Sequence, residues 1–312
     1  MHILFIHQVF LTPNEAGSTR HFELARYLVK AGHRVTIIGS SVNYLTGLAD
    51  PRCRGKFMFK ENIHGVEIVK AWTYSKIHKN FFSRFVSFIS FMFSSVIIGL
   101  KIRKVDLVIG CSPQIFAGVS AMIVSYLKRI PFVLEIRDLW PKFAVEMNVL
   151  TNKKLIYLAE SLEKYLYQHA DYVIINSPGF KPHLMTFNLP EEKIFLIQNG
   201  VDTDMFQPGE RNNSFRREFN LENKFIVMYA GAHGQANNLQ TVIEAAKQLK
   251  DNSKIMFLLI GDGKEKTNLI ELKKSYGLTN VLFINAQPKD RMPEICRASD
   301  VCLAILENRE AF

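Results

Sequence analysis

Cysteine is scarce in this sequence, and its cysteines are not arranged to bind a metal or to form a disulfide framework. The chain of 312 residues has four, at Cys53, Cys111, Cys296 and Cys302. No two of them form a C-x-x-C pair, and none has a histidine at zinc-site spacing. This scarcity argues against a small disulfide-stapled fold and agrees with a reducing cytoplasm, and it leads us to expect no metal cofactor.

The sequence also lacks the signatures of several enzyme classes. It contains no G-x-S-x-G nucleophile elbow, no G-x-x-x-x-G-K-[ST] phosphate loop and no G-x-G-x-x-G fingerprint. We therefore do not expect a hydrolase. The first residues, Met1 to Gln8, lack both a basic lead and a small-residue cleavage site, so they predict a first strand rather than a signal peptide.

Acidic residues are the scarcer charge. There are 29 of them against 39 lysines and arginines, which leaves a formal charge of +10. This excess favours an anionic partner, whether nucleic acid, acidic lipid headgroups or a phosphorylated substrate. Because the basic residues are dispersed and no nucleic-acid-binding module is recognisable, we expect no nucleic acid partner.

Short apolar runs alternate with helical patterns through the first two thirds of the chain, which predicts a doubly wound parallel sheet. A length of 312 residues with 48% hydrophobic residues is enough for two such domains. The loop before the first helix, predicted over residues 18–30, offers Ser18 as its N-cap. The predicted strands of the first domain are Ile3–His7, Val35–Gly39, Val66–Ala71, Asp106–Gly110, Pro131–Ile136, Tyr172–Asn176 and Ile194–Ile197.

A polar stretch between Val201 and Lys224 separates this domain from a second one. We therefore predict an N-terminal domain over residues 1–205 and a C-terminal domain over residues 206–312. The second contains only four predicted strands and reaches Phe312 soon after the last of them, so we expect it to be incomplete. Its predicted strands are Phe225–Gly231, Ile255–Ile260, Val281–Asn285 and Val301–Leu306, with helices over residues 238–249 and 264–276.

An aromatic-rich stretch over residues 81–100 contains one charge, Arg84, and has basic residues on both sides. It has too few uncharged residues after Arg84 to predict a membrane-spanning helix. Two interpretations stay open: a core helix, or a helix lying on an anionic membrane surface. The residues expected to contact such a membrane are Phe81, Phe82, Arg84, Phe85, Phe88, Lys101, Arg103 and Lys104.

Candidate site residues follow the predicted strands, where ligands of open α/β sheets bind. The first strand leads to Gly17 and Ser18 ahead of a helix, and the fifth leads to Arg137 and Asp138 with Trp140. A cation, a carboxylate and an aromatic face can together bind phosphate and sugar hydroxyls. In the second domain two glycine clusters stand at strand-to-helix turns, where a backbone can approach a phosphate. They contain Gly231, His233, Gly261, Gly263 and Lys264.

Taken in order along the chain, these segments resemble glycosyltransferase family 4, whose GT-B architecture has two Rossmann-like domains. The resemblance covers essentially all 312 residues. The EIRDLWP segment is similar to the WbuB-like branch, which is associated with amino-sugar transfer in O-antigen and capsule synthesis. The segments that carry the resemblance are MHILFIHQ, GSTRHFELARYLVKAGHRVTII, EIRDLWP, NGVD, YAGAHG, IGDGKEK, GLTNVLFINAQPKDRMPEI and ASDVCLAIL.

The resemblance implies a retaining transfer, without a metal, of a sugar such as an N-acetylated amino sugar. The donor is a nucleotide sugar and the acceptor a lipid-linked saccharide, at the cytoplasmic face of the membrane. It places Gly17 and Ser18 on the acceptor and phosphate loop, and Arg137 and Asp138 near the anomeric carbon. It places Gly231, His233, Gly261, Gly263 and Lys264 on the nucleotide side.

Three departures from the family pattern keep two alternatives open. The first loop has a single glycine, and the arginine and lysine of many relatives are absent from GAHGQANNLQ, which leaves His233 as the candidate cation there. The segment that carries the donor-binding glutamates in relatives would lie beyond Phe312. The alternatives are a catalytically inactive membrane-docking or binding protein and a UDP-sugar epimerase of the same architecture.

Overall fold

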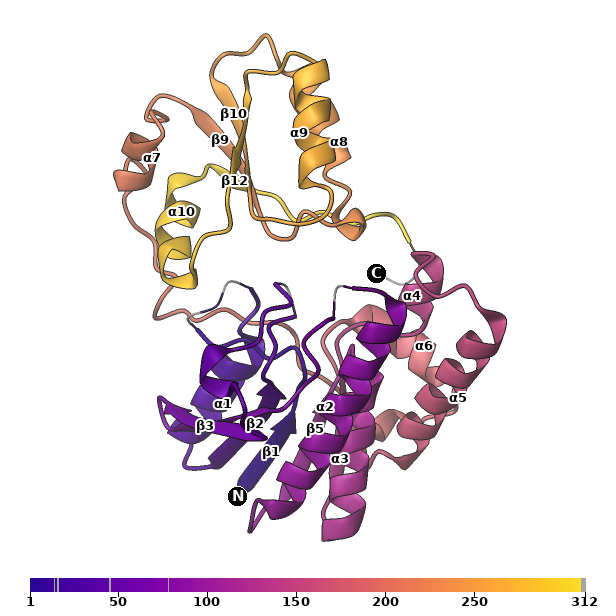
Figure 1. Cartoon of the computed structure of the whole chain (residues 1–312). Helices are drawn as coiled ribbons and strands as arrows, with labels where there is room; N and C mark the ends of the chain where they lie inside the picture. The colour runs from indigo at the N-terminus through magenta and orange to yellow at the C-terminus, as the bar shows by residue number, and fades with distance from the viewer. Residues whose placement is uncertain (14, 16, 45, 78, 310–312) are drawn as a thin grey trace. The chain divides into compact units, whose positions relative to one another are not determined.

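The chain folds into two compact units, each an α/β sheet with helices on both faces (Figure 1). The computed structural model describes residues 1–13, 15, 17–44, 46–77 and 79–309. The first unit comprises Met1–Thr12 and Thr19–Gly200, and the second is formed by the described residues from Val201 onward. Two Rossmann-like domains were predicted, and the structure has this architecture.

The first unit is built on an eight-stranded sheet in the order β3-β4-β2-β1-β5-β6-β7-β8. All neighbouring strands are parallel except β3, which runs antiparallel to β4. The strands are β1 (His2–Ile6), β2 (Arg34–Ser40), β3 (Met58–Ile63), β4 (Val66–Ala71), β5 (Leu107–Cys111), β6 (Phe132–Ile136), β7 (Tyr172–Ile175) and β8 (Ile194–Leu196). The helices are α1 (Arg20–Lys30), α2 (Phe81–Lys101), α3 (Ile115–Lys128), α4 (Lys142–Glu146), α5 (Lys153–His169) and α6 (Lys181–Met185).

Side chains along each strand point alternately to the two faces of this sheet, and each face packs into its own hydrophobic core. In β1, Leu4 and Ile6 join the core formed with α2, α3 and α5, whereas Ile3 and Phe5 join the core formed with α1. Successive side chains of a strand point to opposite faces, so a strand buried on both faces needs a continuous apolar run. This is why HILFI predicts an interior strand.

The second unit has a four-stranded parallel sheet in the order β11-β10-β9-β12. Helices α8 and α9 cover one face through Ile243 and Leu269, and α7 and α10 cover the other through Phe215 and Ile295. The strands are β9 (Phe225–Ala230), β10 (Ile255–Ile260), β11 (Val281–Ile284) and β12 (Val301–Cys302). The helices are α7 (Ser214–Glu218), α8 (Gln240–Gln248), α9 (Lys266–Ser275) and α10 (Met292–Ala298).

Most predicted strands end within a residue or two of the observed ones, and three predictions are wrong. The edge strand β3 was not predicted, because its MFKENI sequence mixes charge with apolar residues on a half-exposed edge. Helix α1 begins at Arg20 with Thr19 as its N-cap, so Ser18 does not cap it. The last strand ends at Cys302 rather than Leu306.

A buried arginine ties the start of the second unit to its sheet. Arg216 of α7 has no solvent-exposed surface, and its guanidinium donates to the carbonyl oxygens of Leu221, Lys224 and Ala298. It also forms an ion pair of 2.7 Å with Asp300. Arg211 shares that carboxylate from an exposed position. Together with Asp300, which lies just before β12, Arg216 therefore holds α7 against the sheet.

We predict that Arg216→Met lowers the free energy of unfolding of the second unit by about 3 kcal/mol, because it removes the buried half of the Asp300 ion pair and leaves several buried carbonyl oxygens without their donor. Arg211→Ala is the matched control and costs less than about 1 kcal/mol, since exposed ion pairs contribute little. Urea unfolding combined with hydrogen exchange of the β9 amides measures both. Equal losses in the two variants would contradict the assignment.

Candidate functional site

The carboxyl edge of the first sheet gathers the polar residues that follow its strands. Strand β1 lies between β2 and β5, so the strand order reverses there, which is where ligands of open α/β sheets bind. His7 and Gln8 follow β1, Ser112 follows β5, and Arg137 with Asp138 follows β6. These groups come from segments far apart in the sequence and meet at one edge.

A buried carboxylate organises this edge. Glu135 of β6 is 2% exposed and accepts a hydrogen bond of 3.0 Å from Arg20 Nε through Oε1. Its Oε2 makes a very short contact with His21 Nε2. Arg20 also donates to the carbonyl oxygens of Ile197 and Gln198, both at 2.7 Å. One guanidinium therefore joins the start of α1 to the ends of β6 and β8.

The pKa of Glu135 is lowered to about 2. Burial alone would raise it, but the charge and hydrogen bonds of His21 and Arg20 outweigh burial. Cys111 adjoins the same carboxylate, and burial with the charge of Glu135 raises the pKa of its thiol well above the usual range. The edge thus holds a permanent carboxylate and a protonated thiol at neutral pH.

Several buried polar atoms at this edge have no hydrogen-bond partner within the described chain. They include both ring nitrogens of His7, the side-chain oxygens of Gln8 and Gln114, Nε of Arg137 and Oδ1 of Asn176. Burial, with the charges of His21 and Arg137, lowers the pKa of His7 well below its usual value, so its ring is neutral. Buried polar atoms normally have partners. Such a concentration is typical of a site that binds a polar ligand.

The predicted catalytic pair lies at the same edge. The backbone amide of Arg137 donates to Ser112 Oγ at 2.8 Å, which fixes the turn after β6. Asp138 has an exposed side chain. Desolvation by the surrounding protein nevertheless raises the pKa of its carboxyl, and the positive charge of Arg137 opposes this rise. The structure therefore brings Arg137 and Asp138 to a solvent-accessible position beside the buried network.

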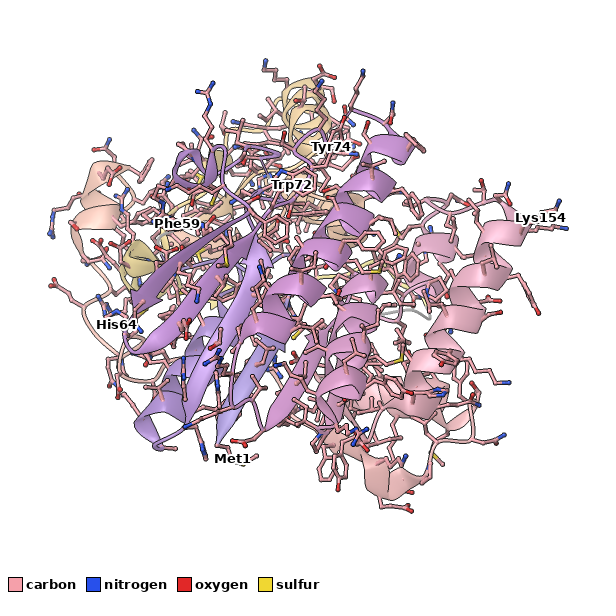
Figure 2. The ribbon with its side chains drawn as sticks, turned by 60° about the horizontal axis from the view of Figure 1, so that its bottom comes forward. Met1, Phe59, His64, Trp72, Tyr74 and Lys154 are labelled. Carbon is pink, nitrogen blue, oxygen red and sulfur yellow. The ribbon has the colours of Figure 1, made fainter. Side chains whose placement is uncertain are left out.

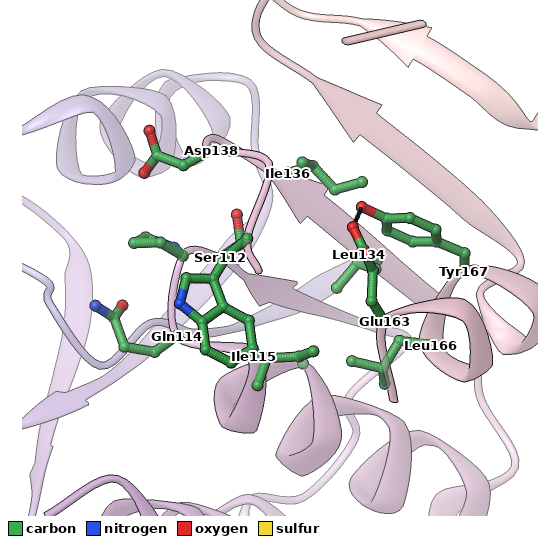
Figure 3. A pocket seen from close by; sticks show the side chains of 12 residues that line it. Ser112, Gln114, Ile115, Leu134, Ile136, Asp138, Glu163, Leu166 and Tyr167 are labelled. Atoms are coloured by element: carbon green, nitrogen blue, oxygen red, sulfur yellow. Dashed lines mark hydrogen bonds between the residues drawn. The ribbon is translucent and has the colours of Figure 1, made fainter. Parts of the chain in front are cut away.

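A cavity that Asp138 helps to line is too small for a sugar. It has a volume of about 20 Å³, which is room for about one water molecule. Figure 3 shows Asp138 at one side of it, and at another the hydrogen bond of 2.7 Å from the Tyr167 hydroxyl to Glu163. The cavity is an interior gap among α3, α5 and β6 rather than a substrate pocket.

Gly17 and Ser18 are exposed, and Gly17 adopts a φ of +133°, a conformation that favours glycine. They stand three and two residues, respectively, before Arg20, the first residue of α1. Residues 14 and 16 of the same loop lie outside the described part of the chain.

In the second unit the two glycine clusters pack directly against each other. A Cβ added to Gly261 would lie 1.9 Å from the Gly231 carbonyl oxygen, and one added to Gly263 would lie 2.4 Å from the His233 carbonyl oxygen. Both glycines also have positive φ values, +145° and +157°. The structure therefore requires Gly261 and Gly263 for loop-to-loop contact, whatever they bind.

His233 does not supply the cation that the sequence suggested. Its side chain is completely buried, and neither ring nitrogen has a hydrogen-bond partner among the residues that the structure describes. Burial, and after it the charge of Lys266, lowers its pKa below the usual 6.5, so the ring is neutral at pH 7. The predicted Lys264 is exposed. Lys266 was not predicted, and its amine donates to the Gly261 carbonyl oxygen at 2.9 Å and to Asn285 Oδ1 at 2.8 Å.

Helix α2 turns its apolar side outward. Phe82 is 71% exposed, Phe93 61% and Ile97 44%, whereas the buried side carries Ser87, Ser90, Ser94 and Ser95 together with Phe91 and Ile98. Among the predicted membrane residues, Phe85, Lys101, Arg103 and Lys104 are also exposed, but Phe88 and Arg84 are half-buried. Phe88 packs against Phe116 of α3 instead, and the side chain of Phe81 lies outside the described residues.

The serines of α2 bind its neighbours. Ser94 Oγ donates to the Trp72 carbonyl oxygen at 2.7 Å, and Ser95 Oγ donates to Ser120 Oγ of α3 at 3.0 Å. Trp72 and Tyr74 follow β4, beside which α2 runs (Figure 2). Helix α2 is long and apolar enough to cross a membrane by composition, but its serine face packs on the first sheet and α3.

One group of side chains has the donor types of a metal site. His21, Cys111 and Glu135 each offer a ligand atom within 4.8 Å of the others. The histidine and the carboxylate already bond to each other, and Arg20 binds the second carboxylate oxygen. A divalent cation would have to break that contact beside a guanidinium, so the group is better described as a buried ion pair.

Glu135, Arg20, His21 and His7 were not predicted from the sequence. A charged residue inside the apolar run FVLEI is the signal that could have revealed the first of them, because a buried charge requires a partner.

Comparisons with known proteins agree with this geometry. The model of Glycosyltransferase Family 4 matches residues 17–205, and that of the group 1 glycosyl transferases matches residues 210–312. WcaI of Escherichia coli K12, named as a colanic acid biosynthesis glycosyl transferase, is 22% identical over 99% of this chain and 77% of its own length. Anabaena HepE, solved with UDP and glucose, superposes with a TM-score of 0.69 at 18% identity, over 100% of this chain and 76% of its own. WaaG, involved in lipopolysaccharide biosynthesis, superposes with a TM-score of 0.67 at 15% identity, over 99% and 76%.

We predict that the first unit loses stability as the pH falls from about 4.5 towards 2. Glu135 has a folded pKa of about 2 against an ordinary 4.5, so its contribution is complete above the unfolded pKa and disappears as the folded group is protonated. Glu135→Gln should weaken this acid dependence. Urea unfolding at pH 7, 4 and 3 measures it, and an unchanged slope in the variant would contradict the role of Glu135.

Proposed function

Because the chain belongs to glycosyltransferase family 4, we propose that it transfers a sugar from a nucleotide sugar to a lipid-linked saccharide in the assembly of a cell-surface polysaccharide. The chain is a glycosyltransferase, and its relatives include enzymes named for colanic acid and O-antigen synthesis. One observation supports the acceptor side above all: Arg137 and Asp138 stand at a carboxyl edge rich in unpartnered polar atoms.

The proposed chemistry uses charge and position. Donor cleavage releases a nucleotide with negative charge on its terminal phosphate, which cations and helix N-termini stabilise. HepE was solved with UDP and UDP-glucose, which supports a uridine nucleotide as the first donor to test. On the other substrate, Asp138 accepts a hydrogen bond from an acceptor hydroxyl while Arg137 supplies positive charge. We propose retention of the anomeric configuration and no metal requirement.

A panel of UDP- and GDP-sugars, including N-acetylated amino sugars, incubated with lipid-linked acceptors tests the proposal. Transfer with retention, read from the anomeric coupling constants of the product, supports it. Conversion of a UDP-sugar to its epimer without acceptor would support the epimerase alternative instead, and neither reaction would support an inactive binding protein.

We predict that Asp138→Ala lowers the turnover number by two to four orders of magnitude, the scale roughly expected for losing a contact to the reacting groups. Asp251→Ala, an exposed aspartate of the second unit, is the control and should leave turnover unchanged. Steady-state kinetics with both substrates saturating measures the effect. Wild-type turnover in Asp138→Ala would remove this residue from the reaction.

Chelation separates the metal-free proposal from the metal interpretation of His21, Cys111 and Glu135. We predict that transfer is unchanged after dialysis against EDTA and that added divalent cations do not raise it. A loss of activity that zinc or magnesium restores would contradict the proposal.

We also propose that the outer face of α2 contacts an anionic membrane surface, where a lipid-linked acceptor is found. The observation that favours this is the exposure of Phe82, Phe93 and Ile97 on the outer face of α2, while four serines of the helix are buried. Large apolar side chains on a helix surface indicate an apolar environment. The exposed Lys101, Arg103 and Lys104 at its end suit anionic headgroups.

We predict that replacing Phe82, Phe93 and Ile97 together by serine lowers binding to anionic vesicles at least 10-fold, since each buried apolar side chain contributes about 1.5 to 3 kcal/mol. The double variant Tyr157→Ser and Leu158→Ser removes exposed apolar groups from α5 instead, and should bind as wild type does. Vesicle sedimentation at rising salt measures both, and binding should weaken with salt. Equal binding by all three proteins would contradict the assignment.

A further inference from the structure

The second unit carries a fixed positive charge that the glycosyltransferase assignment does not by itself explain. Lys266 is the first residue of α9, and its amine donates to the Gly261 carbonyl oxygen, after β10, and to Asn285 Oδ1, after β11. Both acceptors are uncharged, and no ion pair of Lys266 is found among the described residues. An ammonium group has three donors, so one of them is still available.

This amine lies beside the interlocked glycine loops. The amine donates to the Gly261 carbonyl oxygen, and Nε2 of the fully buried His233 lies 3.4 Å from where a Cβ on this glycine would be. The charge of Lys266 accordingly adds to burial in lowering the pKa of His233. His233 is neutral, and its ring nitrogens have no partner in the described part of the chain. Lys264, two residues before Lys266, is exposed and makes no hydrogen bond that the structure describes. Of these three basic side chains, Lys266 is the one that is both charged and held in place.

The position suits a phosphate group. Lys266 begins a helix of ten residues, whose N-terminus favours negative charge. The neighbouring loops are compact because Gly261 and Gly263 have no side chains, so a ligand meets backbone rather than bulky groups at this corner of the sheet. The ring of the buried His233 packs against Gly261, and its nitrogens have no hydrogen-bond partner within the described chain.

We infer that Lys266, and not Lys264 or His233, supplies the cation that binds the diphosphate of the nucleotide donor. This inference rests on the proposed function and names the residue that performs one part of it. The amine donates its remaining hydrogen to a phosphate oxygen while Gly261 and Asn285 hold it in place. Charge-assisted hydrogen bonds of this kind contribute more than neutral ones.

The experiment compares a nucleoside diphosphate with the corresponding nucleoside. Wild type is titrated calorimetrically with UDP, GDP and ADP, and the diphosphate that binds most tightly is used with its own nucleoside. We expect Lys266→Met to weaken binding of the diphosphate about 10- to 100-fold, the loss corresponding to one charge-assisted hydrogen bond, and to leave nucleoside binding unchanged. Lys264→Met is the matched control, and we expect it to bind both as wild type does.

The outcomes separate the inference from the proposed function. Failure of the wild type to bind any diphosphate would overturn the proposed function. Binding by wild type with no selective loss in Lys266→Met would overturn the inference alone, as would an equal loss of diphosphate and nucleoside, which indicates a structural role.

A measurement on the wild-type protein covers the case in which Lys266→Met does not fold. Reductive methylation followed by mass spectrometry reports how far each lysine amine reacts. We expect the diphosphate to protect Lys266 at least several-fold, the nucleoside to protect it little, and Lys264 to react equally in all samples. Equal methylation of Lys266 with and without the diphosphate would overturn the inference.

Discussion

The first unit depends on one buried carboxylate. Placing Glu135 inside a parallel sheet removes a charge from water, which costs several kcal/mol unless partners compensate. Arg20 and His21 compensate from consecutive positions at the start of α1. Because Arg20 also binds two carbonyl oxygens after β8, three separate segments take their positions from the same group. Because Arg137 and Asp138 directly follow β6, their position at the sheet edge depends on these contacts of Glu135.

Much of the fold could be predicted from apolar runs alone. Strands such as β1, β5 and β10 are interior and parallel, so each is apolar throughout and stands out from the polar loops on either side. Strand β3 could not be found this way, because an antiparallel edge strand tolerates charge on both sides: Lys60 is exposed, and Glu61 is half-buried and pairs with Arg52. The end of β12 was missed for a different reason, since LAIL continues the apolar pattern after strand pairing stops.

The candidate site was only partly predictable. Arg137 and Asp138 follow a strand, and the rule that ligands bind at the carboxyl edge places them correctly at that edge. Glu135, which lies inside β6 two residues before Arg137, was not predicted. The sequence predicts Lys264, which adjoins the glycines, and gives no sign of Lys266. Only the course of the chain from Gly263 into α9 shows which of the two amines turns back towards Gly261 and Asn285.

The polarity of α2 has a consequence for how this protein can change. Its packing against the sheet and α3 is carried by serine hydroxyls, a glycine and a few apolar residues on the inner side, where Gly99 leaves room for Val124. The outer aromatic and aliphatic groups contribute little to that packing, so substitutions there need not be balanced by changes inside. In descendants of this sequence, substitutions on the outer face of α2 can therefore change what that face binds without changing the stability of the fold. The inner face of the same helix can stay unchanged.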